Sequence, residues 1–288
     1  MECVGVLILL KGKNVAEQIN DEISEKVEKL KKNGIIPTLV IMWAGEDTDT
    51  LYYISSIEKA CISTGISLIK RNFHERIDQE TFLNEFKAVN ENPTINGIIV
   101  MRPLPPQINE GTIAEQIKPE KDIDCISPIN IAKVFSGTGG GFAPCTAESV
   151  MEILKYYNVE LKGKDVVVIG RSMVVGRPVA MMLLKQNATV TICHSKTKDL
   201  PNVARRADIL VAALGKPNFI NRNFIKKGAV VIDVGINELD NEIVGDVDFD
   251  DAVHMAGMIT PVPGGVGLVT TGVLLRNVLK AVNLQKCY

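Results

Sequence analysis

The sequence has few histidines and no closely spaced cysteines. Only three histidines occur in its 288 residues, at positions 74, 194 and 254, and none has the spacing of metal ligands. The six cysteines are scattered without a CxxC pair, and several lie in apolar stretches. This pattern is typical of reduced, buried thiols, so we expect a cytoplasmic chain without a metal site or a disulfide framework.

Long hydrophobic runs and an excess of one charge are also absent. The longest apolar runs, VGVLILL at the N-terminus and ILVAAL near residue 210, are far shorter than a membrane span. The N-terminal run lacks the basic flank and the cleavage site of a signal peptide, so we interpret it as a strand or a helix lead-in. The net charge of -2 argues against a nucleic-acid partner. We therefore expect a globular chain with neither a membrane nor a nucleic acid as its partner.

Helix and strand patterns alternate in the N-terminal half. An amphipathic helix ends at Gly34, and a second helix ends at Gly65. The predicted order is helix 13–33, strand 37–44, helix 49–64, strand 66–72, helix 78–90 and strand 97–102. This alternation predicts parallel strands joined by crossover helices.

A less regular region follows, with KPEKDIDCISP at 118–128 and the glycine-rich run SGTGGGF at 136–142. A phosphate-binding loop would need a strand before the glycines and a helix directly after them, and neither is predicted here. We therefore predict that the glycine-rich run is a flexible linker between two domains.

The C-terminal half is more regular. Its short apolar strands are separated by helices and glycines, which is typical of a parallel sheet covered on both faces. The predicted elements are helix 146–158, strand 165–170, helix 176–186, strands 188–195, 208–214, 229–237 and 255–260, and helix 270–283. We expect the last helix to fold back onto the first domain.

One strand-to-helix turn carries a nucleotide-binding pattern, VVVIGRSMVVGRP at 166–178. It is not the common GxGxxG, but a strand precedes it and a helix follows. Gly170 allows a tight turn, and the helix that begins near Gly176 offers backbone N–H groups and a positive dipole to a pyrophosphate.

The end of the next strand indicates which dinucleotide binds. An NAD site usually has an acidic residue there for the ribose 2′-hydroxyl, whereas this chain has CHSKT with His194, Ser195 and Lys196. Together with Arg171, these residues suit a 2′-phosphate. The sequence therefore favours NADP, with NAD as the alternative.

Five segments in the second half have the order and spacing of a known family: GRSMVVGRP, TVTICHSKT, GAVVIDVGIN, GDVDF and TPVPGGVG. The first half agrees through the helix that carries Tyr53, PLPP at 103–106, KPEKDID at 118–124 and FAPCT at 142–146. The whole chain thus resembles the bifunctional methylenetetrahydrofolate dehydrogenase/methenyltetrahydrofolate cyclohydrolase family.

The resemblance implies an α/β fold of two domains with a cleft between them. Residues 1–143 would form a folate-binding, catalytic domain, on which the C-terminal helix 268–288 packs. Residues 144–267 would form a Rossmann-like NADP-binding domain. It further implies tetrahydrofolate derivatives as ligands and a homodimer.

The resemblance also implies site residues. Those for the cofactor are Gly170, Arg171, Ser172, Ser195 and Ile236. Those for catalysis and substrate binding are Tyr53, which would stack on or orient the folate, and Asp124, which would hold the pterin ring. Gly267 and Leu268 would lie beside the folate, although the family usually has proline where Leu268 stands.

Departures from the family pattern cluster in the catalytic half. The family lysine four residues after the tyrosine is Ile57, and the family glutamine before PLP is Met101. The other departures are Arg102 for leucine, Cys125 and Ser127 for glycine and histidine, and Ala147 and Ser149 for proline and glycine.

These departures affect the two family reactions differently. Hydride transfer from the folate needs positioning but no base, whereas hydrolysis of the methenyl group needs an acid/base such as a lysine. We therefore predict an active dehydrogenase with weak or absent cyclohydrolase activity. The alternatives are a fully bifunctional enzyme and an idle folate- or NADP-binding protein. A short-chain dehydrogenase would also need lysine at Ile57. A shifted site with Tyr52 and Lys59 is less favoured than a surface role for Lys59.

Overall fold

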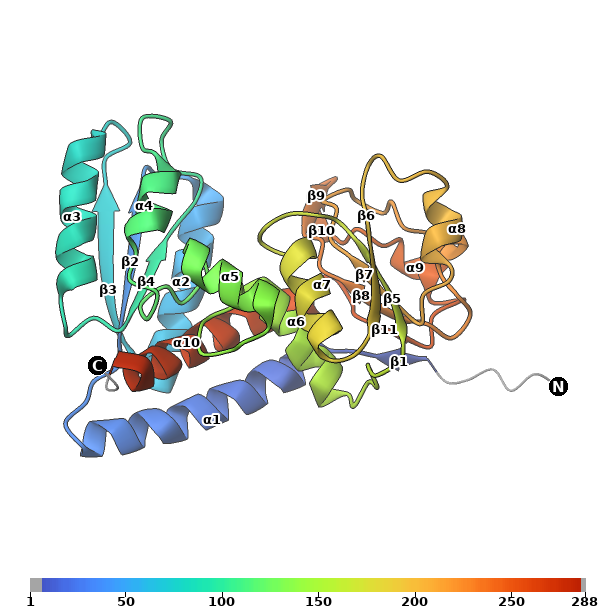
Figure 1. The fold of residues 1–288 in the computed structure, drawn as a ribbon, viewed down its shortest axis with the longest axis horizontal. Helices are drawn as coiled ribbons and strands as arrows, with labels where there is room; N and C mark the ends of the chain where they lie inside the picture. The colour runs from blue at the N-terminus through green and yellow to red at the C-terminus, as the bar shows by residue number, and fades with distance from the viewer. Residues whose placement is uncertain (1–6, 286–288) are drawn as a thin grey trace. The chain divides into compact units, whose positions relative to one another are not determined.

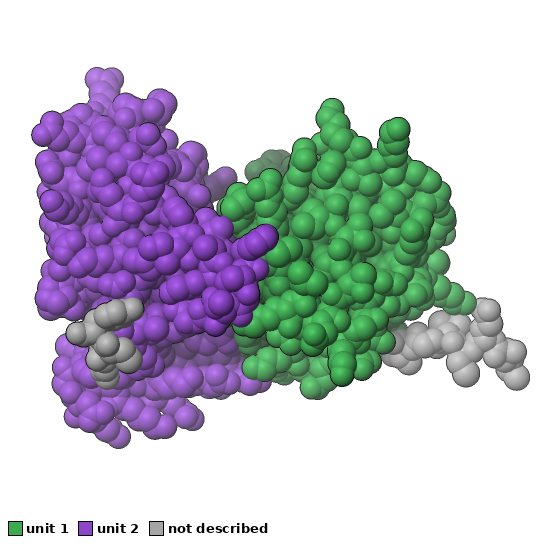
Figure 2. All heavy atoms as spheres, viewed as in Figure 1, with its two compact units in different colours: residues 1–17, 146–270 green, residues 18–145, 271–288 purple. Residues whose placement is uncertain are grey.

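The computed structural model describes residues 7–285, and it divides into two compact units (Figures 1 and 2). Unit 1 contains the described residues up to Glu17 together with Thr146–Thr270, and unit 2 contains Gln18–Cys145 and the described residues from Thr271 on. The chain passes from one unit to the other inside three helices, which are α1 (Gly12–Lys32), α6 (Cys145–Tyr156) and α10 (Val266–Gln285).

Unit 2 is built on a parallel sheet of three strands in the order β3-β2-β4. These strands are β2 (Thr38–Ala44), β3 (Ser67–Phe73) and β4 (Gly97–Val100). Helices α2 (Thr48–Thr64) and α3 (Gln79–Glu91) connect them, and α4 (Glu110–Gln116) and α5 (Pro128–Ser136) follow. The alternation predicted from the sequence is confirmed. Gly65 ends α2 in the left-handed conformation with φ of 77°, as its position in the sequence indicated.

The central strand β2 is apolar along its length because both of its faces are covered. Four consecutive residues, 39–42, have no exposed surface. Val40 and Met42 pack with Phe82 and Phe86 of α3 and with Ile113 of α4. Trp43, the only tryptophan in the sequence, is 7% exposed near the end of the same strand.

Helix α5 is absent from the predicted elements, and it changes the interpretation of the glycine-rich run after it. Ser127 is its N-cap and Pro128 its first residue, while Gly137 ends it with φ of 68°. The run at 136–142 lies wholly inside unit 2, because the side-chain oxygen of buried Asn130 accepts a hydrogen bond from the Phe142 backbone N–H (3.4 Å). The prediction that this run links two domains is therefore wrong.

Unit 1 contains a six-stranded parallel sheet in the order β1-β11-β8-β7-β5-β6. The strands are β1 (Ile8–Leu9), β5 (Asp165–Ile169), β6 (Thr189–Cys193), β7 (Ile209–Ala212), β8 (Val230–Asp233) and β11 (Met258–Ile259). Between them lie α7 (Gly176–Lys185), α8 (Leu200–Ala204), the 3-10 helix η1 (Arg222–Phe224), the hairpin β9 (Asn237–Leu239) with β10 (Glu242–Val244), and α9 (Phe249–Ala252). The predicted first domain starts at residue 1, whereas β1 pairs with β11 and so extends the sheet of unit 1.

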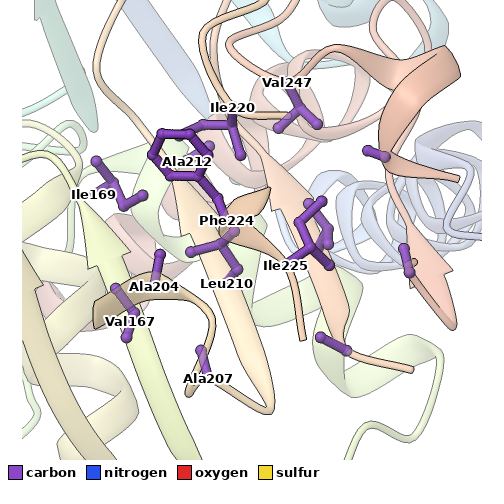
Figure 3. Close-up of a cluster of buried hydrophobic side chains, with 14 of the residues drawn as sticks. Val167, Ile169, Ala204, Ala207, Leu210, Ala212, Ile220, Phe224, Ile225 and Val247 are labelled. Carbon is purple, nitrogen blue, oxygen red and sulfur yellow. The ribbon is translucent and has the colours of Figure 1, made fainter. Parts of the chain in front are cut away.

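The core of unit 1 lies against this sheet (Figure 3). Val167 and Ile169 of β5 and Leu210 of β7 contribute buried side chains, and Phe224 and Ile225 from the 3-10 region pack against them. Burying one such side chain contributes about 1.5–3 kcal/mol. These contacts hold the carboxyl ends of β5 and β7 in place, where ligands bind in sheets of this class.

The composition led to expectations about cysteines, metal sites and membrane spans, and the described residues bear on each of them. Cys61, Cys125, Cys145 and Cys193 are buried, whereas Cys3 and Cys287 lie outside the described part. Within residues 7–285 no group of three or more His, Cys, Asp or Glu side chains is arranged to hold a metal ion. None of the helices in this range is long and apolar enough to span a membrane.

Candidate functional site

Tyr53 lies on α2, whose first turn is capped by Asp47 through a hydrogen bond from the Thr50 backbone N–H (2.9 Å). Burial is the main cause that raises the pKa of Tyr53 above its usual value, and Cys145 and Asp124 add to this effect. The phenol therefore stays protonated and can donate a hydrogen bond at neutral pH. The structure brings Tyr53 and Asp124 together in unit 2, as the sequence analysis expected of one site.

Asp124 follows the segment that runs beside β4. Its Oδ1 accepts a hydrogen bond from the backbone N–H of Cys145 (3.3 Å), the first residue of α6. Burial raises the pKa of Asp124, while the hydrogen bonds from Cys145 and the charge of Arg102 lower it. The Asn277 side chain of α10 donates to the backbone oxygen of Ile123 (3.0 Å) and so fixes the chain next to Asp124.

Arg102 places a positive charge near this carboxylate. It follows β4, and a cis peptide bond joins it to Pro103. From the sequence Arg102 is only a departure from a family leucine, because nothing there indicates its neighbours. The fold supplies that information, since the guanidinium acts electrostatically on Asp124.

Ile57 has no exposed surface, and it shares a helix face with Tyr53, which precedes it by one turn. An apolar side chain therefore fills the position where the family has a lysine. Tyr52 is 80% exposed and Lys59 is exposed as well, so the shifted pair considered in the sequence analysis lies on the outer surface of α2.

Asp122 is a structural residue of this region that sequence reasoning missed. It is 1% exposed and accepts hydrogen bonds from the backbone N–H groups of Ile126 (2.8 Å) and Ser127 (2.9 Å) and from the Asn130 side chain (2.8 Å). It thereby fixes the turn after Asp124, where Cys125 has φ of 60°. This left-handed conformation explains why glycine suits the position of Cys125.

The second group of expected residues lies in unit 1. At the end of β5, a Cβ added to Gly170 would lie 2.0 Å from the backbone oxygen of Ala213, and one added to Gly176 would lie 2.2 Å from that of Gly170. Both positions therefore need glycine. Ser172 accepts hydrogen bonds from the N–H groups of Val175 (3.1 Å) and Gly176 (3.4 Å) and thus caps the start of α7. The turn leaves Ser172 and Arg171 exposed.

The turn after β6 presents the residues expected to select the dinucleotide. The backbone N–H of His194 donates to the Thr197 hydroxyl (2.9 Å), and that of Lys196 donates to His194 Nδ1 (3.2 Å). Ser195 lies exposed at this turn, and residues 193–197 carry no acidic side chain. The local charge therefore suits an anionic group.

Ile236 and Gly267 lie side by side, since a Cβ added to Gly267 would be 3.3 Å from Ile236 Cδ1. Ile236 is 67% exposed, and Leu268, in the first turn of α10, is 50% exposed. Within unit 1, Ile236, which is expected to contact the cofactor, thus lies next to Gly267, which is expected to lie beside the folate.

Asp233, at the end of β8, was not singled out from the sequence. It is 3% exposed, and its carboxylate accepts hydrogen bonds from the backbone N–H groups of Gly235 (2.9 Å), Asp246 (3.0 Å) and Val247 (2.9 Å). Burial is the main cause that raises its pKa from 3.8 to about 6, against the effect of these hydrogen bonds.

This shift predicts a pH dependence of stability. The folded pKa of Asp233 exceeds the unfolded value, so the folded chain binds more protons between pH 3.8 and about 6. The stabilisation from this group is therefore complete below pH 3.8 and is lost as the pH rises through about 6. Relative to Asp233→Asn, the free energy of unfolding should fall by up to about 3 kcal/mol over this range. Urea unfolding followed by circular dichroism at several pH values measures it, and parallel curves for the two proteins would contradict it.

Comparison with known proteins agrees with this arrangement. Residues 144–286 match the family model "Tetrahydrofolate dehydrogenase/cyclohydrolase, NAD(P)-binding domain", and residues 10–124 match the corresponding catalytic domain. The "Bifunctional protein FolD" of Alkaliphilus oremlandii is 52% identical over 96% of this chain and 98% of its own length.

Solved structures give the same result. The bifunctional enzyme FolD from Campylobacter jejuni is 41% identical, with a TM-score of 0.95 over 96% of this chain and 99% of its own. The methylenetetrahydrofolate dehydrogenase-cyclohydrolase of Trypanosoma brucei, solved with NADP cofactor and an inhibitor, is 37% identical, with a TM-score of 0.92 over 96% of this chain and 97% of its own. The chain therefore belongs to the tetrahydrofolate dehydrogenase/cyclohydrolase family.

Proposed function

We propose that the protein is an NADP-dependent methylenetetrahydrofolate dehydrogenase of one-carbon folate metabolism. The observation that carries this proposal is the turn at Gly170, where the backbone packs too closely against Gly170 and Gly176 for any side chain and where α7 begins. Such a turn suits the pyrophosphate of a dinucleotide. The solved relative from Trypanosoma brucei, which holds NADP, supports the same cofactor.

Asp124 and Tyr53 are proposed to bind the folate. A carboxylate can accept two parallel hydrogen bonds from the pterin ring N–H and amino group, and such charge-assisted pairs fix orientation as well as affinity. The protonated phenol of Tyr53 supplies a donor or a stacking face beside Asp124. These two residues hold the substrate, and neither needs to remove a proton.

The dehydrogenase reaction places modest demands on the protein. NADP, when bound, accepts a hydride from the folate methylene carbon. The neighbouring folate nitrogens stabilise the cation that remains, so the chain must orient the reactants and exclude water rather than provide a base. The apolar side chain of Ile57 is compatible with this step.

The second family activity is less well supported by the residues of this chain. The names of the relatives favour the fully bifunctional alternative over a dehydrogenase alone. Hydrolysis of methenyltetrahydrofolate, however, requires protons to move at the reacting water, and the buried Ile57 offers no group for this. We therefore propose a hydrolytic step that is present but slow compared with hydride transfer.

Formation of NADPH from methylenetetrahydrofolate and NADP, followed by absorbance, tests the proposed dehydrogenase. A catalytically idle protein would bind both ligands, as shown by calorimetry, without forming NADPH. A homodimer stays a prediction, which sedimentation of the purified chain would test.

Cofactor preference gives a separate test at Ser195. Replacing Ser195 by aspartate places a carboxylate on the exposed turn after β6, where it repels a 2′-phosphate and can accept a bond from a ribose hydroxyl. We expect this repulsion to lower kcat/KM for NADP by about tenfold, which corresponds to about 1.4 kcal/mol. The value of kcat/KM for NAD should hold or rise. Ser195→Asn is the matched uncharged control. Equal losses with the two cofactors would contradict the assignment.

A further inference from the structure

A buried carboxylate connects the loops at the carboxyl end of the sheet in unit 1. Asp246 follows β10 and has no exposed surface. Its Oδ2 accepts hydrogen bonds from the backbone N–H groups of Leu214 (2.7 Å) and Gly215 (3.1 Å), and its Oδ1 accepts one from Lys216 (2.8 Å). Three successive backbone donors after β7 thus converge on one side chain.

Asp246 also holds the segment after β8. Its Oδ1 accepts a hydrogen bond from the Asn237 side chain (3.0 Å), and its own backbone N–H donates to Asp233 (3.0 Å). There is no room for side chains at the glycines in this network. A Cβ on Gly235 would lie 2.4 Å from the Asp246 carboxylate, and one on Gly245 would lie 1.9 Å from that of Asp233.

The segment held by Asp246 lies directly beside the glycine turn proposed to bind the dinucleotide. The backbone N–H of Ala213, the residue before Leu214, donates to the oxygen of Ile169 (2.8 Å). The Ala213 oxygen would be only 2.0 Å from a Cβ at Gly170, so the two backbone segments are in direct contact. Any movement of residues 214–216 therefore changes the backbone packing against Gly170.

Ile236 is positioned by the same network. The residue before it, Gly235, donates its N–H to Asp233, and the side chain of the residue after it, Asn237, donates to Asp246. Ile236 itself is largely exposed and contributes nothing to the core. The location of Ile236 therefore depends on the carboxylates of Asp233 and Asp246, which bind the residues before and after it.

We propose that Asp246 is a positioning residue for the dinucleotide, which fixes the 214–216 loop and Ile236 around the Gly170 turn. This inference rests on the proposed function, since the ligand of that turn is taken to be NADP. Asp246 does not itself touch the ligand in this proposal. It acts through the backbone groups and the Asn237 side chain that it binds.

The chemistry of the network requires a carboxylate. Four N–H donors share two oxygens of Asp246, two donors on each. In Asp246→Asn an amide NH₂ group replaces one of these oxygens. This group is itself a hydrogen-bond donor, so it cannot accept from the two N–H groups that the oxygen bound. Two hydrogen bonds are then lost while the shape and volume of the side chain are retained.

Calorimetric titration of the purified full chain with NADP tests the proposal. Losing two hydrogen bonds to a charged group should raise the Kd of Asp246→Asn at least about tenfold. KM for NADP should rise in parallel, with a smaller change in kcat. Asn237→Ala removes only the link to Ile236, so its Kd should rise by less, about threefold. The latter variant keeps the test valid if Asp246→Asn does not fold.

Asp208→Asn is the matched control. Asp208 precedes β7, and its carboxylate accepts hydrogen bonds from the Asp165 backbone N–H (3.0 Å) and the Lys226 side chain (2.7 Å). These bonds lie at the amino ends of the strands, away from the Gly170 turn. This variant should bind NADP like the wild type even if its melting temperature falls. Wild-type affinity for NADP in both Asp246→Asn and Asn237→Ala would overturn the positioning role of Asp246 and leave the proposed cofactor intact. An equal loss of NADP affinity in Asp208→Asn would do the same. A wild-type chain that does not bind NADP would overturn the proposed cofactor, and this inference with it.

Discussion

Replacing Ile57 by lysine, together with Met101 by glutamine, is expected to raise the rate of methenyltetrahydrofolate hydrolysis by about 10²-fold or more. A positioned general acid/base contributes about 10²–10⁴-fold, and the wild-type chain has only an apolar side chain at position 57. Burial would lower the pKa of the new lysine toward the range in which it can exchange protons. Loss of methenyltetrahydrofolate absorbance, corrected for the uncatalysed reaction, measures the rate.

Ile57→Met with Met101→Gln is the matched control, because it keeps position 57 apolar and similar in volume. It should leave hydrolysis slow, and both double variants should retain NADPH formation. A lysine in a site with no exposed surface is costly, so a lower melting temperature is expected as well. If the wild-type chain already hydrolyses its substrate as fast as it oxidises methylenetetrahydrofolate, the proposed slow step is wrong and the fully bifunctional alternative holds.

The second large effect is expected at Asp124. Asp124→Asn should lower kcat/KM for methylenetetrahydrofolate by about 10²-fold or more, because each hydrogen bond to a charged group contributes about 1.5–3 kcal/mol and an amide cannot accept two parallel bonds. The apparent affinity for NADP should stay within about twofold, a change of about 0.4 kcal/mol. Steady-state kinetics with each substrate varied in turn measures both quantities.

Asp78→Asn is the control for the loss of a carboxylate elsewhere in unit 2. Asp78 caps α3 through the Thr81 backbone N–H (2.8 Å), and asparagine is an equally good N-cap. Its kinetics should match the wild type. Unchanged kcat/KM in Asp124→Asn would remove Asp124 from the substrate site, whatever the role of Tyr53.

Much of the fold could be predicted from local patterns. Glycine stops, apolar strands and amphipathic helices identified the elements of both halves because each of these patterns is set by near neighbours in the chain. Helix α5 was missed because its buried face includes a polar residue, Asn130, whose bonds to Asp122 and Phe142 depend on the folded arrangement. The pairing of β1 with β11 is equally hidden, since about 250 residues separate the two strands.

The candidate site divides in the same way. The Gly170 turn was recognisable because the strand, the glycines and the helix are contiguous. The proximity of Arg102 to Asp124 and the four donors on Asp246 were not, because these contacts join segments that are distant in the sequence. A buried aspartate that accepts backbone N–H groups looks like any loop carboxylate until the fold is known.

The single tryptophan allows the unfolding of unit 2 to be followed by fluorescence. Trp43 is buried in β2 of unit 2, and unit 1 contains no tryptophan. Its emission therefore reports the unfolding of unit 2, whereas circular dichroism follows the helices and strands of both units. Where the two signals change at different urea concentrations, the two units unfold in separate steps, and the tryptophan transition belongs to unit 2.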